Sequence, residues 1–331
     1  MQEVPFLSIK GIKAGHAQNI EGGTGCTVIL SEEGAVAGVD VRGGSPGTRE
    51  TDLLDPVNKV EQVHGTFLTG GSAFGLNAAA GIMKYLEEKG KGYDTGVAKV
   101  PIVTGAVLFD LIAGDPKARP DEKMGYQACL NVKAEGEALE EGCVGAGTGA
   151  TVGKLFGPQF AMKGGLGAVA YQIGDLKVGA ITAVNCLGNV YDPASGEAVA
   201  GMLAEDGKTI LSVEETMLKM AANSQSGDLF GGNTTISVVV TNARITKAQA
   251  KKTASMAHDG YARTIRPSHT PVDGDTIFVL ATGEVEADLH ILGILSTRAI
   301  ETSVIRGVTT AKTLYGFKGV SEGGGIDILG I

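Results

Sequence analysis

One stretch of the chain, residues 229–242, reads LFGGNTTISVVVTN and changes its composition at a single peptide bond. Glycines and one asparagine end at Asn233, and the residues from Thr234 onward are mostly β-branched, as in a buried strand. The plain interpretation is a junction between a loop and a strand. A second interpretation is chemical, because a threonine hydroxyl at such a junction can attack the carbonyl group in front of it.

Cleavage of the Asn233–Thr234 bond would make Thr234 a chain terminus, with its α-amine a few bonds from its own hydroxyl. An α-amine has an ordinary pKa of about 7.7 to 8.0, so it can accept a proton near neutral pH. One residue then supplies both nucleophile and base. The chain could free this amine itself, by an N-to-O acyl shift and hydrolysis of the resulting ester. We therefore predict self-cleavage between Asn233 and Thr234, with Gly231 and Gly232 bending the segment before the bond.

The composition restricts the class of protein. The chain has 331 residues, 43% hydrophobic and 20% charged, so we expect one globular domain spanning residues 1–331. A net charge of −9 without a dense Lys/Arg cluster argues against nucleic-acid and membrane partners. The start lacks a signal peptide and the four cysteines lack metal spacing, so a cytoplasmic protein with reduced core thiols is expected.

Hydrophobic periodicity predicts several strands and helices that do not alternate strictly. Runs of adjacent strands between helices favour an α+β fold of stacked mixed sheets covered by helices over a doubly wound fold. The predicted strands are 25–30 and 35–44 around a turn at 31–34, then 64–71, 166–174, 176–192, 234–242 and 275–284. The predicted helices are 72–90, 121–131, 212–223, 246–264 and 288–314, and an exposed loop is predicted before Asn233.

Other chemistries find little support in the sequence. The stretch GAGTGA, residues 145–150, fits a loose dinucleotide pattern but follows a polar segment instead of a buried strand. A P-loop is not expected, because Thr148 replaces its first glycine and Leu155 replaces its hydroxyl residue. The five histidines show no i, i+4 pair, so neither a metal nor a cofactor is expected. A non-enzymatic nucleotide-binding module remains a third class of hypothesis, and it would keep an intact chain.

Three stretches together resemble a known family of self-cleaving amidases. They are GGNTTISVVVTN (231–242), HTPVDGDTIFVLATG (269–283) and LTGGSAFGLNAAAG (68–81). The family includes L-aminopeptidase/D-esterases, β-aminopeptidases and nylon-oligomer (6-aminohexanoate) endohydrolases. The resemblance spans about residues 15–314 and implies a four-layer αββα sandwich, cut into an α chain (1–233) and a β chain (234–331). It also implies self-association of αβ units, as tetramers.

The resemblance assigns roles to matching residues. Thr234 matches the nucleophile. Thr235 is the competing candidate, but it lies one residue after the matching position. The Asn-Thr pair is similar to the nylon-oligomer branch, as are Asp273 and Asp275, which would hold the new amine and raise its pKa. The alternative for the Asp-Gly-Asp sequence is an ordinary turn that opens a strand.

Two further residues match family positions. Asn185 matches the asparagine that stabilises the oxyanion, and Asn189 is its local competitor. Lys154 matches a lysine of the nylon-oligomer branch that would steady the nucleophile or a product carboxylate. The alternative for Lys154 is a solvated surface lysine.

The sequence departs from the family pattern at Phe109. Some relatives have a tyrosine at this position, so a phenolic hydroxyl that would assist at the site is missing here. Phe109 is assigned to substrate binding. Tyr171 or a backbone N–H group would have to replace that donor.

These assignments predict a hydrolase that cleaves linear amides, such as nylon oligomers, through an ester on Thr234. The alternative is an aminopeptidase or β-aminopeptidase that acts on short peptides or amino amides. An acidic site would favour substrates with a free ammonium group in both cases. An ornithine-type acetyltransferase uses the same self-cleaving threonine logic, but the motifs resemble that group less.

Overall fold

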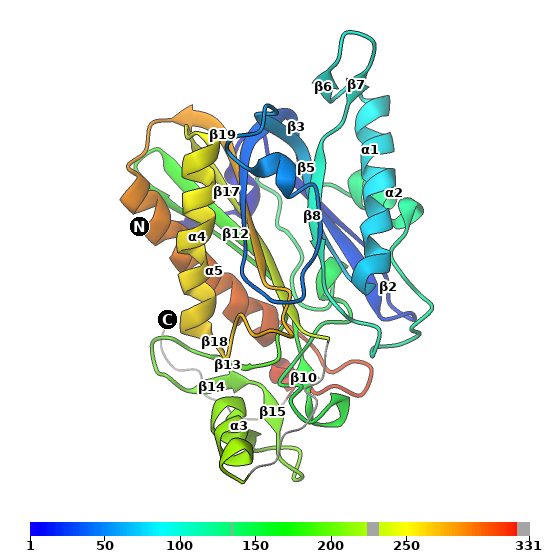
Figure 1. The fold of residues 1–331 in the computed structure, drawn as a ribbon, viewed down its shortest axis with the longest axis vertical. Coiled ribbons are helices and arrows are strands. Elements are labelled where there is room, and N and C mark those ends of the chain that lie inside the picture. The colour runs from blue at the N-terminus through cyan, green and yellow to red at the C-terminus, as the bar shows by residue number, and fades with distance from the viewer. Residues whose placement is uncertain (134, 224–231, 323–331) are drawn as a thin grey trace.

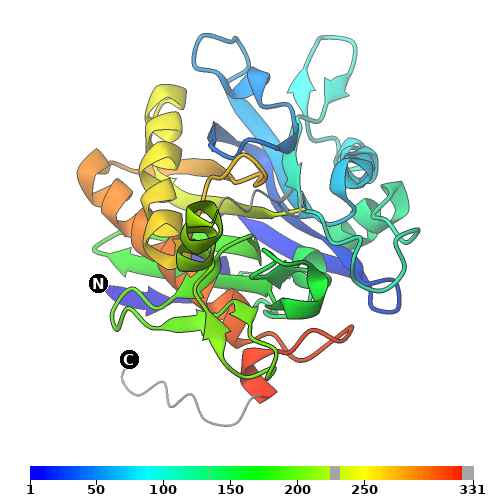
Figure 2. The ribbon, with the colours of Figure 1, turned by 60° about the horizontal axis from the view of Figure 1, so that its bottom comes forward.

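The computed structural model describes residues 1–133, 135–223 and 232–322, and its elements form four layers. Helices α4 (Lys247–Thr264) and α5 (Leu289–Thr309) lie on one side of the strands, and α1 (Ala78–Glu88) and α2 (Glu122–Leu130) lie on the other (Figure 1). The short helix α3 (Val213–Ala222) and several small strands lie at one end of this sandwich (Figure 2). The predicted α+β, αββα architecture is confirmed.

Ten of the strands form one continuous hydrogen-bonded sheet, and the other strands of the described residues form four small sheets. Its order is β1-β11-β12-β17-β19-β3-β5-β8-β4, and β2 pairs with β3. The longer strands are β2 (Lys13–Asn19), β3 (Thr24–Val41), β5 (Gln62–Thr69), β8 (Val103–Val107), β11 (Gly165–Ile173), β12 (Leu176–Asn185), β17 (Thr234–Ala243) and β19 (Thr276–Val285). The shorter ones are β1 (Gln2–Val4), β4 (Gly47–Arg49), β6 (Tyr93–Asp94), β7 (Lys99–Val100), β9 (Thr151–Val152), β10 (Met162–Lys163), β13 (Asn189–Tyr191), β14 (Ala198–Ala200), β15 (Met202–Leu203), β16 (Ile210–Leu211) and β18 (Ile265–Arg266).

Strand β3 connects the two sheet layers. The sequence predicted two strands around a turn at residues 31–34, but β3 is continuous, with a shift of register between Leu30 and Ala35. Its first half pairs with β2 and turns Val28 toward α1 and α2, whereas its second half pairs with β19 and turns Val36 toward α4 and α5. The predicted turn is therefore wrong, because the polar residues there bend a strand that passes from one layer to the next.

The central strands β17 and β19 are buried on both faces. They pair in parallel, and their side chains alternate between the core that separates the two sheets and the core beneath the helices α4 and α5. The first core includes Ile236, Val238, Val240, Phe278 and Leu280, and the second includes Val239, Ile277 and Val279. The continuous apolar runs in the sequence follow from this double burial.

Capping residues set the helix ends close to their predicted positions. Asp121 caps α2, Ser212 caps α3, and Thr246 forms a capping box with Gln249 at the start of α4. Helix α5 ends at Thr309, five residues before the predicted end at 314. Residues 224–231 of the predicted exposed loop, Gly231 among them, lie outside the described residues, whereas the last two residues of that loop, Gly232 and Asn233, are buried and not exposed.

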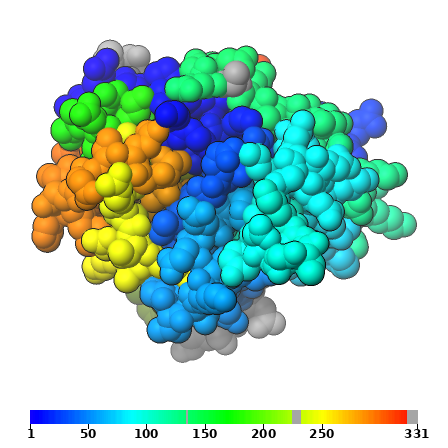
Figure 3. Space-filling model, turned by 90° about the horizontal axis from the view of Figure 1, so that it is seen from above, coloured from blue at the N-terminus to red at the C-terminus, as the bar shows by residue number. Residues whose placement is uncertain are grey.

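Segments far apart in the sequence share one surface. From above, the early segments in blue and cyan lie beside the late ones in yellow and orange (Figure 3), consistent with the pairing of β3 with β19. None of the helices in the described ranges is both long enough and apolar enough to cross a bilayer.

Candidate active site

Thr234 begins strand β17 and lies beside Asn185, its register partner on β12. The side chain of Thr234 is on the same face of β17 as Ile236, and it lines a cavity of about 240 Å³. Successive side chains of a strand point to opposite faces, so the side chain of Thr235 points away from this cavity. The geometry therefore favours Thr234 over its rival as the residue that meets a ligand.

The carbonyl group of Asn233 receives two hydrogen-bond donors. The Oγ1 hydroxyl of Thr234 donates to the Asn233 oxygen, and the backbone N–H of Gly274 donates to the same oxygen at 3.0 Å. A Cβ atom on residue 274 would lie 2.7 Å from Thr234 Oγ1, so the absence of a side chain permits this approach. Sequence analysis missed Gly274, although it lies between the two predicted acids.

The side chain of Asp275 is buried, and both of its carboxylate oxygens have hydrogen-bond partners. Its Oδ1 accepts from the backbone N–H of Thr235 at 2.8 Å. Its Oδ2 accepts from the backbone N–H of His269 at 2.9 Å and lies 2.9 Å from the ring Nδ1 of His269. Sequence analysis missed His269 as well, although it stands in the quoted HTPVDGD motif.

Asp273 lies beside Asn233, with which it forms an isolated parallel β-bridge. Its carboxylate accepts from the backbone N–H of Leu187 at 3.3 Å and from the hydroxyl group of Thr270. Burial, and next the negative charge of Asp275, raise the pKa of Asp273 to about 6. The segment that carries the two acids leads directly into β19, and it does not form a hairpin turn.

Lys154 is completely buried, so the alternative of a solvated surface lysine is wrong. Its Nζ donates to the backbone oxygens of Asn185 and Gly232, both at 2.9 Å. Burial lowers its pKa to about 7, although Cys186 and Asp273 act in the opposite direction. The charged ammonium form is therefore less favoured here than for a lysine in water.

The side chain of Asn185 is held at both ends. Its Oδ1 accepts from the backbone N–H of Thr151 at 2.9 Å, while its Nδ2 donates to the Phe109 oxygen at 3.0 Å and lies 3.4 Å from the Gly232 oxygen. Its amide group therefore points at the segment before Thr234.

Asn189, the competitor of Asn185, makes different contacts. Its Nδ2 donates to the Leu211 oxygen at 2.7 Å, and its Oδ1 accepts from the Met202 N–H at 3.0 Å. These bonds hold neighbouring strands together, so the side chain of Asn189 has a structural role.

Phe109 lines the cavity next to Thr234, together with residues such as Ser45 and Ser72. Tyr171 does not replace the missing tyrosine. It bonds to Thr302 on α5 at 2.8 Å and pairs with Val178, seven residues along β12 from Asn185 and therefore roughly 23 Å away. The backbone N–H of Gly274 is the alternative donor that the structure places at the Asn233 carbonyl.

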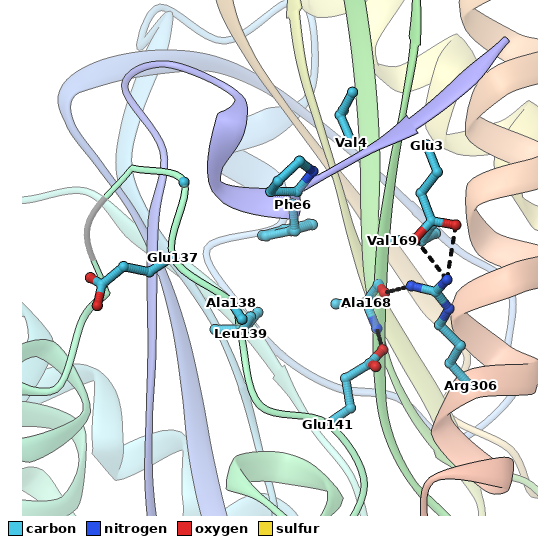
Figure 4. Close-up of a pocket in the computed structure, with 12 residues that line it drawn as sticks. Glu3, Val4, Phe6, Glu137, Ala138, Leu139, Glu141, Ala168, Val169 and Arg306 are labelled. Atoms are coloured by element: carbon cyan, nitrogen blue, oxygen red, sulfur yellow. Dashed lines mark hydrogen bonds and ion pairs between the residues drawn. The ribbon is translucent and has the colours of Figure 1, made fainter.

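A larger cavity, of about 430 Å³, lies at the edge of strand β11, where β1 ends (Figure 4). Glu141 accepts from the backbone N–H of Ala168 at 2.6 Å, and Arg306 donates to the Ala168 oxygen at 3.0 Å and to Glu3 at 2.8 Å. The side chains of Glu141 and Arg306 thus satisfy the backbone N–H and oxygen of Ala168 at the edge of the sheet. None of the predicted site residues lines this cavity.

The nucleotide hypothesis has no structural counterpart. Residues Gly145–Gly147 form one short 3₁₀-helix in place of the strand–loop–helix unit that binds a dinucleotide. Among the described residues, no three His, Cys, Asp or Glu side chains are grouped to hold a metal ion. The four cysteines are free.

The layered architecture matches solved structures of known enzymes. One is a β-aminopeptidase from Burkholderia sp., with a TM-score of 0.69 at 16% identity, covering 96% of this chain and 92% of that one. Another is the L-aminopeptidase D-Ala-esterase/amidase from Ochrobactrum anthropi, with a TM-score of 0.69 at 17% identity, covering 95% and 88%. The latter is described as a variant of the N-terminal nucleophile hydrolase fold, and that is the fold of this chain.

The sequence comparison identifies the family. The profile of peptidase family S58 matches residues 7–322, and the chain belongs to this family. An uncharacterized aminopeptidase from Mycobacterium tuberculosis is 42% identical over 92% of this chain and 89% of its own length. A 6-aminohexanoate-oligomer endohydrolase from Kocuria sp. is 32% identical over 86% of this chain and 77% of its own. The protein is thus a hydrolase that acts on amide bonds.

Proposed function

We propose that the protein is a self-cleaving N-terminal threonine hydrolase that cleaves linear amides. The main support is the pair of donors at the Asn233 carbonyl, the Thr234 hydroxyl and the Gly274 N–H. The mature enzyme would be one domain of residues 1–331, built from an α chain (1–233) and a β chain (234–331).

Self-cleavage begins with attack of Thr234 Oγ1 on the carbonyl carbon of Asn233. The N–H of Gly274 stabilises the negative charge that develops on the Asn233 oxygen. The C–N bond then breaks, the Thr234 nitrogen takes the proton that Oγ1 gives up, and an ester links Asn233 to the Thr234 oxygen. Water hydrolyses this ester and leaves a carboxylate on Asn233. Lys154, bonded to the neighbouring Gly232 oxygen, is placed to offset that charge.

Turnover repeats this chemistry on a substrate. The freed amine of Thr234 takes the proton of Oγ1 as the oxygen attacks the substrate carbonyl, and then passes it to the leaving amine. Asn185 Nδ2 lies 3.4 Å from the Gly232 oxygen, next to the cleavage site, and it would stabilise the oxyanion. Asp273 and Asp275 would orient the new amine, and water then releases the acyl group from Thr234.

The substrate class is the finer part of the proposal. The Asn-Thr junction and the two aspartates favour linear amides such as 6-aminohexanoate oligomers, which accords with the name of the Kocuria relative. Phe109 would contact the substrate in the cavity. The second candidate is an aminopeptidase on short peptides or amino amides, favoured by the 42% identical relative that carries that name. Membership of family S58 gives the acetyltransferase hypothesis no support.

We also propose that αβ units associate, as tetramers. Ile291 and Ile294 on α5 are 41% and 51% exposed and offer apolar surface for such contacts. Light scattering after gel filtration measures the assembly.

The deciding experiment is a denaturing gel with intact mass measurement. Wild type should give two fragments, with Thr234 as a new amino terminus, and Thr234→Ala should remain one chain of 331 residues. Thr235→Ala is the matched control and should still be cut at the same bond. An uncut but active wild-type chain would refute the proposal. Assays with 6-aminohexanoate oligomers and with dipeptide amides then separate the two substrate classes.

A further inference from the structure

His269 has an unusual backbone. Its φ is +58°, in the left-handed region that few residues other than Gly occupy. In this conformation both its backbone N–H and its ring Nδ1 reach Oδ2 of Asp275, each at 2.9 Å. The Nδ1 atom must carry a proton to bond to a carboxylate, so the contact also fixes the tautomer of the ring.

The His269 ring is held from the helix side of the sheet. It packs edge to face against His258 of α4, with centroids 4.8 Å apart, and lies 6.0 Å from Tyr261 of the same helix. The ring of His258 is fixed in turn, because its Nε2 lies 2.9 Å from the backbone oxygen of Asp40. These contacts hold the imidazole ring of His269 in one orientation, with its Nδ1 atom toward Asp275.

Asp275 transmits this orientation to the cleavage site. Its second oxygen, Oδ1, accepts from the N–H of Thr235, the residue that follows the nucleophile. The backbone oxygen of Asp275 also accepts from the N–H groups of Arg42 and Gly43, at 3.0 Å and 3.2 Å. A chain of contacts therefore runs from His269 through Asp275 to the first peptide units of β17.

We propose that His269 is a positioning residue for self-cleavage: its Nδ1 proton locks the Asp275 carboxylate, which fixes the backbone of Thr234 and Thr235 for attack on Asn233. This inference rests on the proposed function. Asp275 touches the nucleophile's strand directly, whereas His269 acts only through it. No proton transfer by His269 is required.

Three substitutions separate this role from packing and from backbone strain. In His269→Asn the amide nitrogen takes the place of Nδ1, and asparagine tolerates positive φ. In His269→Gln the amide group lies one carbon farther out, so the donor is misplaced. In His269→Gly the backbone strain is relieved but no side-chain donor remains. The exposed His290, changed to glutamine, is the matched control.

The rate of self-cleavage is measured on a gel after refolding of each uncut precursor. Loss of a hydrogen bond to a charged group corresponds to on the order of 10-fold or more, so His269→Gln and His269→Gly should slow by that factor. His269→Asn should stay close to wild type. Glycine or glutamine variants that cleave at the wild-type rate would overturn the proposal, as would an asparagine variant as slow as glycine.

The unprocessed Thr234→Ala background guards against misfolded variants. There, NMR of labelled histidine should detect a slowly exchanging Nδ1–H of His269, and Asp275→Asn should abolish it. Absence of this proton in the folded Thr234→Ala protein would also overturn the inference. A wild-type chain that never cleaves would instead refute the proposed function itself, and the two failures are therefore distinguishable.

Discussion

The substitution Gly274→Ala tests the steric basis of the site. The φ of Gly274 lies outside the left-handed region, so alanine fits the backbone and the change is purely one of space. The added Cβ would lie 2.7 Å from Thr234 Oγ1, 2.9 Å from the Ser45 oxygen and 3.2 Å from Thr234 Cγ2.

Carbon atoms in good contact are separated by about 3.5 to 4.0 Å, so the Thr234 side chain or the 274 backbone must move by roughly 1 Å. A misplacement of about 1 Å at a reacting centre can cost about 10²-fold in rate. Overpacking of this kind also lowers the free energy of unfolding by about 1 to 3 kcal/mol. We therefore expect about 100-fold slower self-cleavage of a protein that still folds.

The assay follows the two fragments on a denaturing gel after refolding of the precursor, and urea unfolding is measured in the Thr234→Ala background. The control is Gly65→Ala in β5, where the nearest atom to an added Cβ is the flexible Leu30 Cδ2 at 3.3 Å. This control should cleave at a rate near that of wild type. If Gly274→Ala also cleaves at the wild-type rate, the close approach of residue 274 to Thr234 does not govern the reaction.

Two further substitutions test the polar groups of the site. Asn185→Ala should reduce kcat by about 10²- to 10³-fold with a mature enzyme still formed, because it removes the amide donor of the oxyanion; unchanged kcat would exclude this role. Burial raises the pKa of Asp273 to about 6 from 3.8, so the folded protein binds this proton more tightly than the unfolded chain. The stability that the acid contributes is therefore present below about pH 4 and lost as the pH rises through about 6. Asp273→Asn, which stays uncharged, should gain stability relative to the Thr234→Ala background between these values in urea titrations, and a constant difference would contradict the pKa shift.

Local sequence signals predicted the elements that frame the site. The capping residues Asp121, Ser212 and Thr246 placed three helix starts, and the β-branched run after Thr234 placed β17. The turn predicted at residues 31–34 was wrong because polar residues in a bent strand and in a turn have the same local pattern. Only the pairing of β3 with partners distant in sequence distinguishes the two.

The sequence predicts the residue types of the candidate site, and that assignment stays a prediction, but the sequence does not indicate how these residues are arranged in space. Asn185, Asp273 and Asp275 are brought close to Thr234 by the pairing of β12, β17 and β19. Lys154 follows β9, and its Nζ reaches the same place by bonding to the Asn185 and Gly232 oxygens. No periodicity could show that Lys154 is buried, since its partners are backbone oxygens of distant segments. Gly274 contributes a backbone N–H to the site, and any residue type except proline would have supplied one. The residue type therefore did not indicate this contribution.

The strand order has a consequence for the processed enzyme. The long strands of the proposed β chain, β17 and β19, lie between β12 and β3 of the proposed α chain, so each fragment would complete the sheet of the other. In the proposed cut form the fragments would stay interleaved, but reassembly after denaturation would require two molecules to meet. Recovery of the native state would then depend on protein concentration, and dilution would make unfolding effectively irreversible. The lifetime of the mature enzyme would thus be governed by its unfolding rate.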